Sequence, residues 1–168
     1  VEVDAETGRV AVRRYAVDPA WFPTVMRDFT YLVQARMCPA CQARLGEETE
    51  ERAPRTDASG KVVFETRRVR YGDDPVAVAA ECCSQPPEYR GGLLPVMEIV
   101  FRLLLANRNQ PLALDELTEQ VADWVRPGDG RVISPVVIDR LLLADDFYGI
   151  RPVEERQTAE GNQCHARD

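Results

Sequence analysis

Two pairs of cysteines carry the residue types most able to do chemistry in this chain of 168 residues. Cys38 and Cys41 are separated by two residues, a spacing that lets two thiolates turn toward one metal ion. Cys82 and Cys83 are adjacent and could supply the two further ligands that a closed tetrahedral site requires. We therefore predict that these four cysteines bind a structural zinc ion.

The adjacent pair is the less regular half of this predicted site. Neighbouring side chains of a strand point to opposite faces, so both thiolates could not easily face one ion there. At a helix end or an irregular turn they lie about 100° apart, and joint ligation becomes feasible. Two alternatives stay open: Cys164-His165 supplies a missing ligand, or Cys82 and Cys83 are small buried apolar residues.

The sequence lacks the common catalytic patterns. His165 is the single histidine, and the chain contains no GxSxG, phosphate-loop or dinucleotide-binding glycine pattern. Cys38 and Cys41 could form a redox pair, although their surroundings lack the βαβ pattern typical of thioredoxin-like sites. We predict a protein that is not an enzyme, with a thiol-based redox sensor as an alternative.

The composition is that of an ordinary soluble globular chain, with 45% apolar and 29% charged residues. No apolar run approaches the ~18 residues of a membrane span, and the first residues lack a signal-peptide pattern. Five cysteines are too few for a disulfide-dense secreted scaffold, and with a metal-binding spacing they fit a reducing cytosol. A cytoplasmic protein is expected. Its net charge of −7 disfavours non-specific adhesion to nucleic acid or anionic membranes.

Short hairpins and helices are predicted around the cysteines. Alternating apolar and polar residues predict a β-hairpin over residues 1–17. Apolar spacing predicts a helix over 22–36, which leads into the first cysteine pair. A second hairpin is expected around the turn at 56–61. An N-cap aspartate followed by proline opens a helix over 75–83, which ends at the second cysteine pair.

Two cysteine pairs that bracket a β-hairpin resemble a zinc ribbon. The segment departs from that pattern in its adjacent second pair and in the helix that precedes this pair. Residues 36–90 contain few large apolar side chains. Segments this small commonly need a metal or a disulfide to fold, so we expect the metal to clamp the hairpin region.

A different pattern begins after the Pro- and Gly-rich breaker at 85–92, where we place a domain boundary. Apolar stripes predict a helix after Pro95, a second one that includes Leu117 and Trp124, and a third one capped by Ser134-Pro135. A short strand is expected at 147–150. The predicted units are residues 1–92, a helical domain over 93–155 and a polar tail over 156–168.

Two short motifs narrow the identity of the helical domain: Gln110-Pro111-Leu-Ala-Leu-Asp115-Glu-Leu117 and Asp145-Asp-Phe147-Tyr-Gly149-Ile-Arg151-Pro. They resemble the winged helices of the RNA polymerase delta subunit and related HARE-type domains. Those domains carry a "kPl…eL" second helix and end in a "dgrF…GLR" strand. The resemblance implies a winged-helix fold and a link to transcription, but no particular site residue.

Binding of DNA through the third helix is disfavoured by its charge. Arg140 is its single basic residue, against the acidic Asp139, Asp145 and Asp146. An acidic surface repels the phosphate backbone that supplies much of the affinity for DNA. A contact with another protein is therefore the expected role of this domain.

A basic cluster on the second predicted hairpin is formed by Arg67, Arg68 and Arg70. It could bind an anionic partner such as nucleic acid. The acidic run Glu47–Glu51 is expected to form a solvated loop close by, and its carboxylates to pair with these arginines. We favour this pairing over nucleic-acid binding.

Together these patterns predict an α+β protein. A zinc-ribbon-like β-hairpin region with flanking helices is followed by a C-terminal winged-helix-like three-helix domain. The predicted function is that of a zinc-binding accessory or regulatory protein, linked to transcription, that acts mainly through protein–protein contacts. The first alternative is a DNA-binding transcriptional regulator, and the second is the redox sensor.

Overall fold

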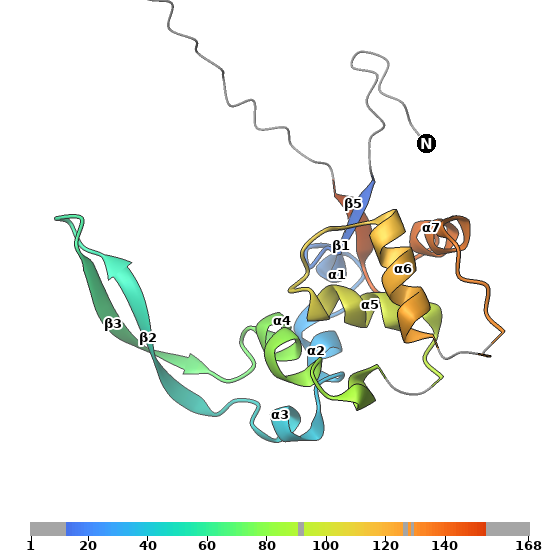
Figure 1. The fold of residues 1–168 in the computed structure, drawn as a ribbon. Helices are drawn as coiled ribbons and strands as arrows, with labels where there is room; N and C mark the ends of the chain where they lie inside the picture. Colours follow the sequence, from blue (N-terminus) through green and yellow to red (C-terminus); the bar gives the residue numbers. More distant parts are fainter. Residues whose placement is uncertain (1–12, 91–92, 126–127, 129, 154–168) are drawn as a thin grey trace, which may run out of the picture.

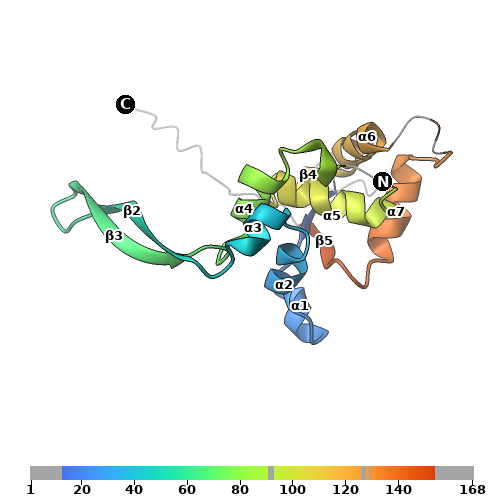
Figure 2. The ribbon, with the colours of Figure 1, turned by 90° about the horizontal axis from the view of Figure 1, so that it is seen from below.

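The computed structural model describes residues 13–90, 93–125, 128 and 130–153. It mixes helices and strands, as predicted for an α+β protein. A helical body carries a small three-stranded sheet, and a long two-stranded hairpin extends away from this body (Figures 1 and 2). Within the described part of the chain, every helix is too short or too polar to span a bilayer.

The middle strand of the three-stranded sheet is β1 (Arg14–Val17). It pairs antiparallel with β4 (Leu112–Ala113) and with β5 (Ile150–Val153). The sheet therefore joins segments from both sides of residue 92, where the sequence suggested a domain boundary. Most of the predicted N-terminal hairpin, residues 1–12, lies outside the described residues.

The core of the body lies between this sheet and the helices α5 (Val96–Ala106), α6 (Leu114–Trp124) and α7 (Pro135–Leu143). These are the three C-terminal helices that the sequence predicted. The largest fully buried side chains include Tyr15, Phe22, Phe101, Leu104, Leu105, Leu117, Ile138 and Ile150. One core therefore combines the N-terminal strand with the C-terminal helices.

The prediction of one continuous helix over 22–36 is wrong. The chain forms α1 (Trp21–Thr24) and α2 (Phe29–Gln34), with Met26 between them in the left-handed region at a φ of 55°. Asp28 opens α2, because its side chain accepts a hydrogen bond from the backbone N–H of Tyr31 at 3.1 Å. Aspartate competes with the helical backbone in this way, which starts a new helix rather than continuing the old one.

The extended hairpin consists of β2 (Glu48–Thr56) and β3 (Val62–Arg70), and we call residues 48–70 the arm (Figure 1). The predicted turn at its tip is confirmed. The Asp57 carboxylate accepts hydrogen bonds from the backbone N–H groups of Ser59 and Lys61, at 2.8 and 3.0 Å. These bonds close the loop between the two strands.

The acidic run that the sequence placed in a loop lies mostly on a strand. Residues 48–51 belong to β2, where Glu48 lies opposite Arg70, Glu50 opposite Arg68 and Glu51 opposite Arg67. Opposite charges on directly facing residues stabilise an antiparallel pair, which offsets the low strand propensity of glutamate.

The last strand begins later than the sequence predicted. The carboxylate of Asp145 accepts hydrogen bonds from the backbone N–H groups of Phe147, Tyr148 and Ile150, at 2.8–3.1 Å. Residues 147–149 therefore wrap around this side chain. β5 starts at Ile150, where the chain meets β1.

A buried ion network ties the end of α2 to α5. The side chain of Glu98 on α5 is 8% exposed and accepts hydrogen bonds from Arg36, Arg102 and Tyr148 at 2.7–3.1 Å. Burial raises the pKa of Glu98, but the two guanidinium groups lower it by more, so the net pKa lies below its ordinary value of 4.5. Arg36 precedes the first cysteine pair by two residues, so the network also fixes the start of that segment.

We expect Glu98→Gln to lower the free energy of unfolding by about 3 kcal/mol, because it leaves two buried guanidinium groups without a counter-charge. Since the folded-state pKa is depressed, the stabilisation by Glu98 is present above pH 4.5 and is lost as the pH falls through the lower folded-state value. Denaturant titrations at neutral and acidic pH measure both effects.

The matched control is Glu81→Gln, which breaks the ion pair between Glu81 and Arg108. This pair lies on the surface, with the Glu81 side chain 60% exposed and the Arg108 side chain 59% exposed. This change should cost less than about 1 kcal/mol. Equal losses in the two variants would contradict the structural role of Glu98.

Candidate metal centre

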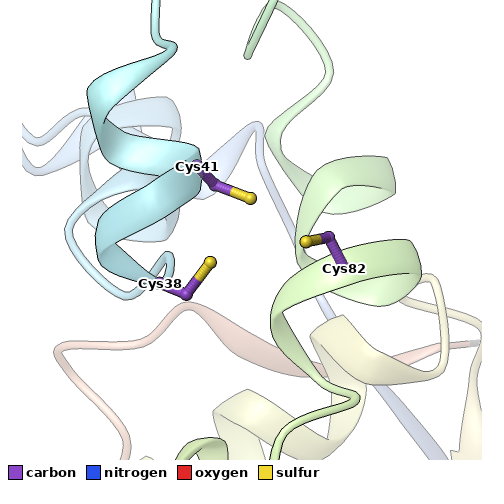
Figure 3. Close-up of side chains that lie close together, drawn as sticks. All are labelled: Cys38, Cys41 and Cys82. Carbon is purple, nitrogen blue, oxygen red and sulfur yellow. The ribbon is translucent and has the colours of Figure 1, made fainter.

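The first cysteine pair lies at the start of α3 (Pro39–Ala43). Cys38 is the N-cap residue in an extended conformation, and Pro39 occupies the first helical position. Proline favours this position and keeps the residue before it extended. Cys41 follows one turn later, so both sulfur atoms turn to the same side of the chain (Figure 3).

The second pair lies on a helical turn, which decides how its two thiols point. α4 (Pro75–Val78) continues into the π-helical turn η1 (Ala79–Cys83). In this turn the backbone N–H of Ser84 donates to the carbonyl of Ala79 at 2.9 Å. The two adjacent cysteines therefore diverge around a helix rather than across a strand. Cys82 is exposed and Cys83 is buried.

Three sulfur atoms meet where these two helical segments face each other. The Sγ atoms of Cys38, Cys41 and Cys82 all lie within 4.8 Å of one another (Figure 3). Tetrahedral zinc with Zn–S bonds of about 2.3 Å holds its sulfur ligands roughly 3.8 Å apart. A small inward movement of the thiols would accommodate such an ion. This cluster could therefore hold a metal.

Cys83 lies beside this group of three but is not part of it. Its side chain is 1% exposed, and its Sγ accepts a hydrogen bond from the backbone N–H of Cys38 at 3.3 Å. Burial raises the pKa of the Cys83 thiol to about 12. Its predicted role as a ligand stays a prediction. The other proposed source of a ligand, residues 164–165, lies outside the described residues.

Tyr71 contacts the cluster, although the sequence analysis did not identify it as a site residue. Its hydroxyl donates to the Sγ of Cys41 at 3.1 Å, and the Arg44 guanidinium lies 4.1 Å from its ring centroid. Burial raises the pKa of Cys41, but the hydrogen bond from Tyr71 and the neighbouring thiols lower it by more. The same hydrogen bond raises the pKa of Tyr71 to about 12. Tyr71 thus stabilises a thiolate at Cys41.

The position of Tyr71 depends on the register of the arm. Its backbone N–H donates to the carbonyl of Glu47 at 2.8 Å, in the rung that follows the last pair of β2 and β3. The sequence offered one signal, an aromatic residue directly after an expected strand. It could not show that this residue meets Cys41.

The apolar surroundings of the cluster are small. Met37, Cys41, Cys83 and Tyr89 form a buried group apart from the main core. Tyr89 belongs to the short turn η2 (Pro87–Tyr89) and packs edge-on against Trp124 of α6. This small group of apolar side chains stabilises the base of the arm only weakly. A bound metal would therefore add stability there.

The predicted basic cluster lies on β3 of the arm. Arg67 pairs with Glu51 at 3.0 Å, as the sequence predicted for this acidic run. Arg68 and Arg70 lie opposite Glu50 and Glu48. The arm is therefore a strip of alternating charges rather than a purely basic surface.

Comparisons with family models, with curated proteins and with solved structures found no match for this chain.

We expect Tyr71→Phe to weaken metal binding by about 10- to 100-fold, the usual effect of losing a hydrogen bond to a metal ligand. Competition with a chromogenic chelator measures this affinity. Tyr31→Phe is the matched control, because Tyr31 is 72% exposed on α2. If both variants bind metal as tightly as the unaltered protein, the hydrogen bond to Cys41 plays no part in metal binding.

Proposed function

We propose that the protein is a zinc-stabilised interaction protein in which the cysteines at the base of the arm hold a structural zinc ion. The observation that carries this proposal is the meeting of Cys38, Cys41 and Cys82 within 4.8 Å. These residues flank the arm on both sides. An ion bound by them would close the base of the arm and present it to a protein partner.

The donor set favours zinc over harder metals. Thiolates are the ligands preferred by zinc and by soft transition metals, whereas calcium and magnesium take oxygen ligands. A zinc ion with four cysteine ligands would join the two cysteine segments through four metal–sulfur bonds. Cys83 would complete the tetrahedron, because its sulfur already approaches Cys38 from the buried side. A closed set of four ligands is typical of structural rather than catalytic zinc.

The helical part supports contacts with proteins better than contacts with DNA. The arrangement of α5, α6 and α7 with β4 and β5 is compatible with a winged-helix-like domain, in which β1 supplies the middle strand. On α7, Asp139 accepts a hydrogen bond from the Tyr15 hydroxyl at 2.7 Å. The acidic residues of α6, and Asp145 and Asp146 directly after α7, oppose the approach of a phosphate backbone. We therefore propose an accessory or regulatory role, linked to transcription, that is exerted through proteins.

Metal analysis of the purified protein tests the proposal. We expect one zinc ion per chain, and a lower melting temperature after chelation, because metal-binding energy contributes to folding. Cys41→Ser and Cys82→Ser should lose the zinc ion, whereas the control Cys164→Ser, outside the described residues, should keep it. A metal-free protein whose melting temperature does not respond to chelators would contradict the structural role and favour the thiol redox sensor.

The fourth ligand is tested with Cys83→Ser in the cobalt-substituted protein. Thiolate-to-cobalt absorption should fall by about one quarter if four cysteines bind the ion. An unchanged absorption would limit the ligand set to the three clustered cysteines. Circular dichroism of each sample separates this effect from unfolding, because Cys83 is also a buried packing residue.

A further inference from the structure

The arm has little packing of its own. Every residue of β2 and β3 is exposed or half-buried, so both faces of the arm meet solvent. Its sheet has two strands, and among the described residues each of them has one edge without a neighbouring strand. Two-stranded hairpins are marginally stable alone, and long open edges are normally paired or blocked. The arm therefore has the features of a sheet to which another strand can add.

The hydrogen bonds at the two ends of the arm identify the outward-facing backbone groups. The N–H of Tyr71 donates to the carbonyl of Glu47, and the N–H of Asp57 donates to the carbonyl of Lys61, at 2.8 and 2.9 Å. In an antiparallel ladder, bonded pairs alternate with pairs whose N–H and C=O groups face away. Odd-numbered residues of the arm therefore form the ladder. Even-numbered residues turn their backbone groups outward.

The two edges of the arm differ in their ability to accept a strand. Pro54 has an even number and lies on β2 opposite Phe64, so its missing N–H interrupts the outward row of β2. β3 contains neither proline nor glycine. The unbroken outward row of β3 consists of Val62, Phe64, Thr66, Arg68 and Arg70. The open edge of the arm is therefore the edge of β3.

We propose that β3 of a second copy of this chain adds to the β3 edge, antiparallel and about a twofold axis at Thr66. The two arms would then form one four-stranded sheet, with the β2 strands outermost. Strand addition of this kind gains main-chain hydrogen bonds, and a twofold axis requires the same surface from each copy. The inference rests on the proposed function, because it names a partner for the arm.

The sequence of β3 complements itself in this register. Glu65 lies opposite Arg67 of the second copy, and Val63 lies opposite Val69 of the second copy. These facing positions are non-hydrogen-bonded ones, where side chains approach most closely. An axis moved by one residue would place Glu65 opposite Glu65, or Arg67 opposite Arg67. Charge therefore selects the axis at Thr66.

The new pairs extend contacts that already exist within each arm. Glu65 pairs with Arg55 at 3.2 Å, and Arg67 pairs with Glu51 at 3.0 Å. In the dimer, each Arg67 would lie between Glu51 of its own arm and Glu65 of the second copy. Each such row contains three alternating charges, which is more favourable than an isolated exposed pair.

The other face contributes an aromatic contact. Phe64 is 70% exposed in the single chain, and it would lie opposite Arg68 of the second copy, where the guanidinium can stack on its ring. The interface is small, because one strand of each copy supplies it. Small interfaces of this kind are weak, and we expect a dissociation constant on the order of micromolar.

Thr66→Pro tests the strand pairing in the zinc-loaded full chain. The N–H of Thr66 faces outward, so proline in both copies removes the two hydrogen bonds at the twofold axis and leaves the ladder of the arm intact. Arg52→Pro is the matched control, because Arg52 lies directly opposite Thr66 and its N–H faces outward on the β2 edge. Analytical ultracentrifugation should show a dissociation constant at least about tenfold higher for Thr66→Pro, and nearly unchanged for Arg52→Pro.

Charge exchange tests the register. Glu65→Arg and Arg67→Glu should each weaken self-association, because each places like charges opposite each other twice. A mixture of the two variants should restore association, because the glutamate introduced at position 67 of one copy then faces the arginine introduced at position 65 of the other. This rescue is specific to the proposed pairing and would not follow from unfolding of either variant.

Several results would overturn the pairing. They are an unaltered protein that stays monomeric at millimolar concentration, equal association of Thr66→Pro and Arg52→Pro, and a mixture that associates no better than its components. Zinc content is measured in every sample. A metal-free protein that shows the predicted association would support the pairing and contradict the zinc site, so the two proposals can fail separately.

Discussion

The contact between the two cysteine segments is the constraint on which the position of the arm depends. The chain leaves the body after α2, forms α3 and the arm, and returns through α4 to α5. The arm itself buries almost nothing, so its position is set at its base. There, Cys38 and Cys41 face Cys82, and the hydroxyl of Tyr71, directly after β3, donates a hydrogen bond to Cys41. A metal at this point would convert two weakly packed turns into one rigid support.

The base of the arm is in turn coupled to the core of the body. Arg36, just before the cysteines, is held by Glu98 of α5, and Trp124 of α6 packs against Tyr89 beside the thiols. The body and the cysteine cluster therefore share contacts on two sides. A change at the cluster would reach α5 and α6 through these side chains, whereas the tip of the arm could respond to a partner without disturbing the core.

Local signals in the sequence predicted much of the fold. Asp74 with Pro75, Ser134 with Pro135 and the turn after Thr56 act over a few residues, and all three lie where they were expected. The spacing of Cys38 and Cys41 likewise predicted half of the candidate site. Long-range features could not be predicted in this way. The pairing of β1 with β4 and β5, the π-turn that separates Cys82 from Cys83 and the contact of Tyr71 with Cys41 all depend on tertiary packing.

X-ray absorption spectroscopy at the zinc edge, on the purified full chain, tests directly whether the clustered cysteines bind zinc. We expect a zinc ion whose ligand shell consists of sulfur atoms at about 2.3 Å. We also expect this shell to be lost in Cys41→Ser, because the Cys41 side chain lies at the centre of the contacts around the cluster. A protein without zinc, or a ligand shell dominated by nitrogen and oxygen atoms near 2.0–2.1 Å, would contradict a zinc site built from these cysteines.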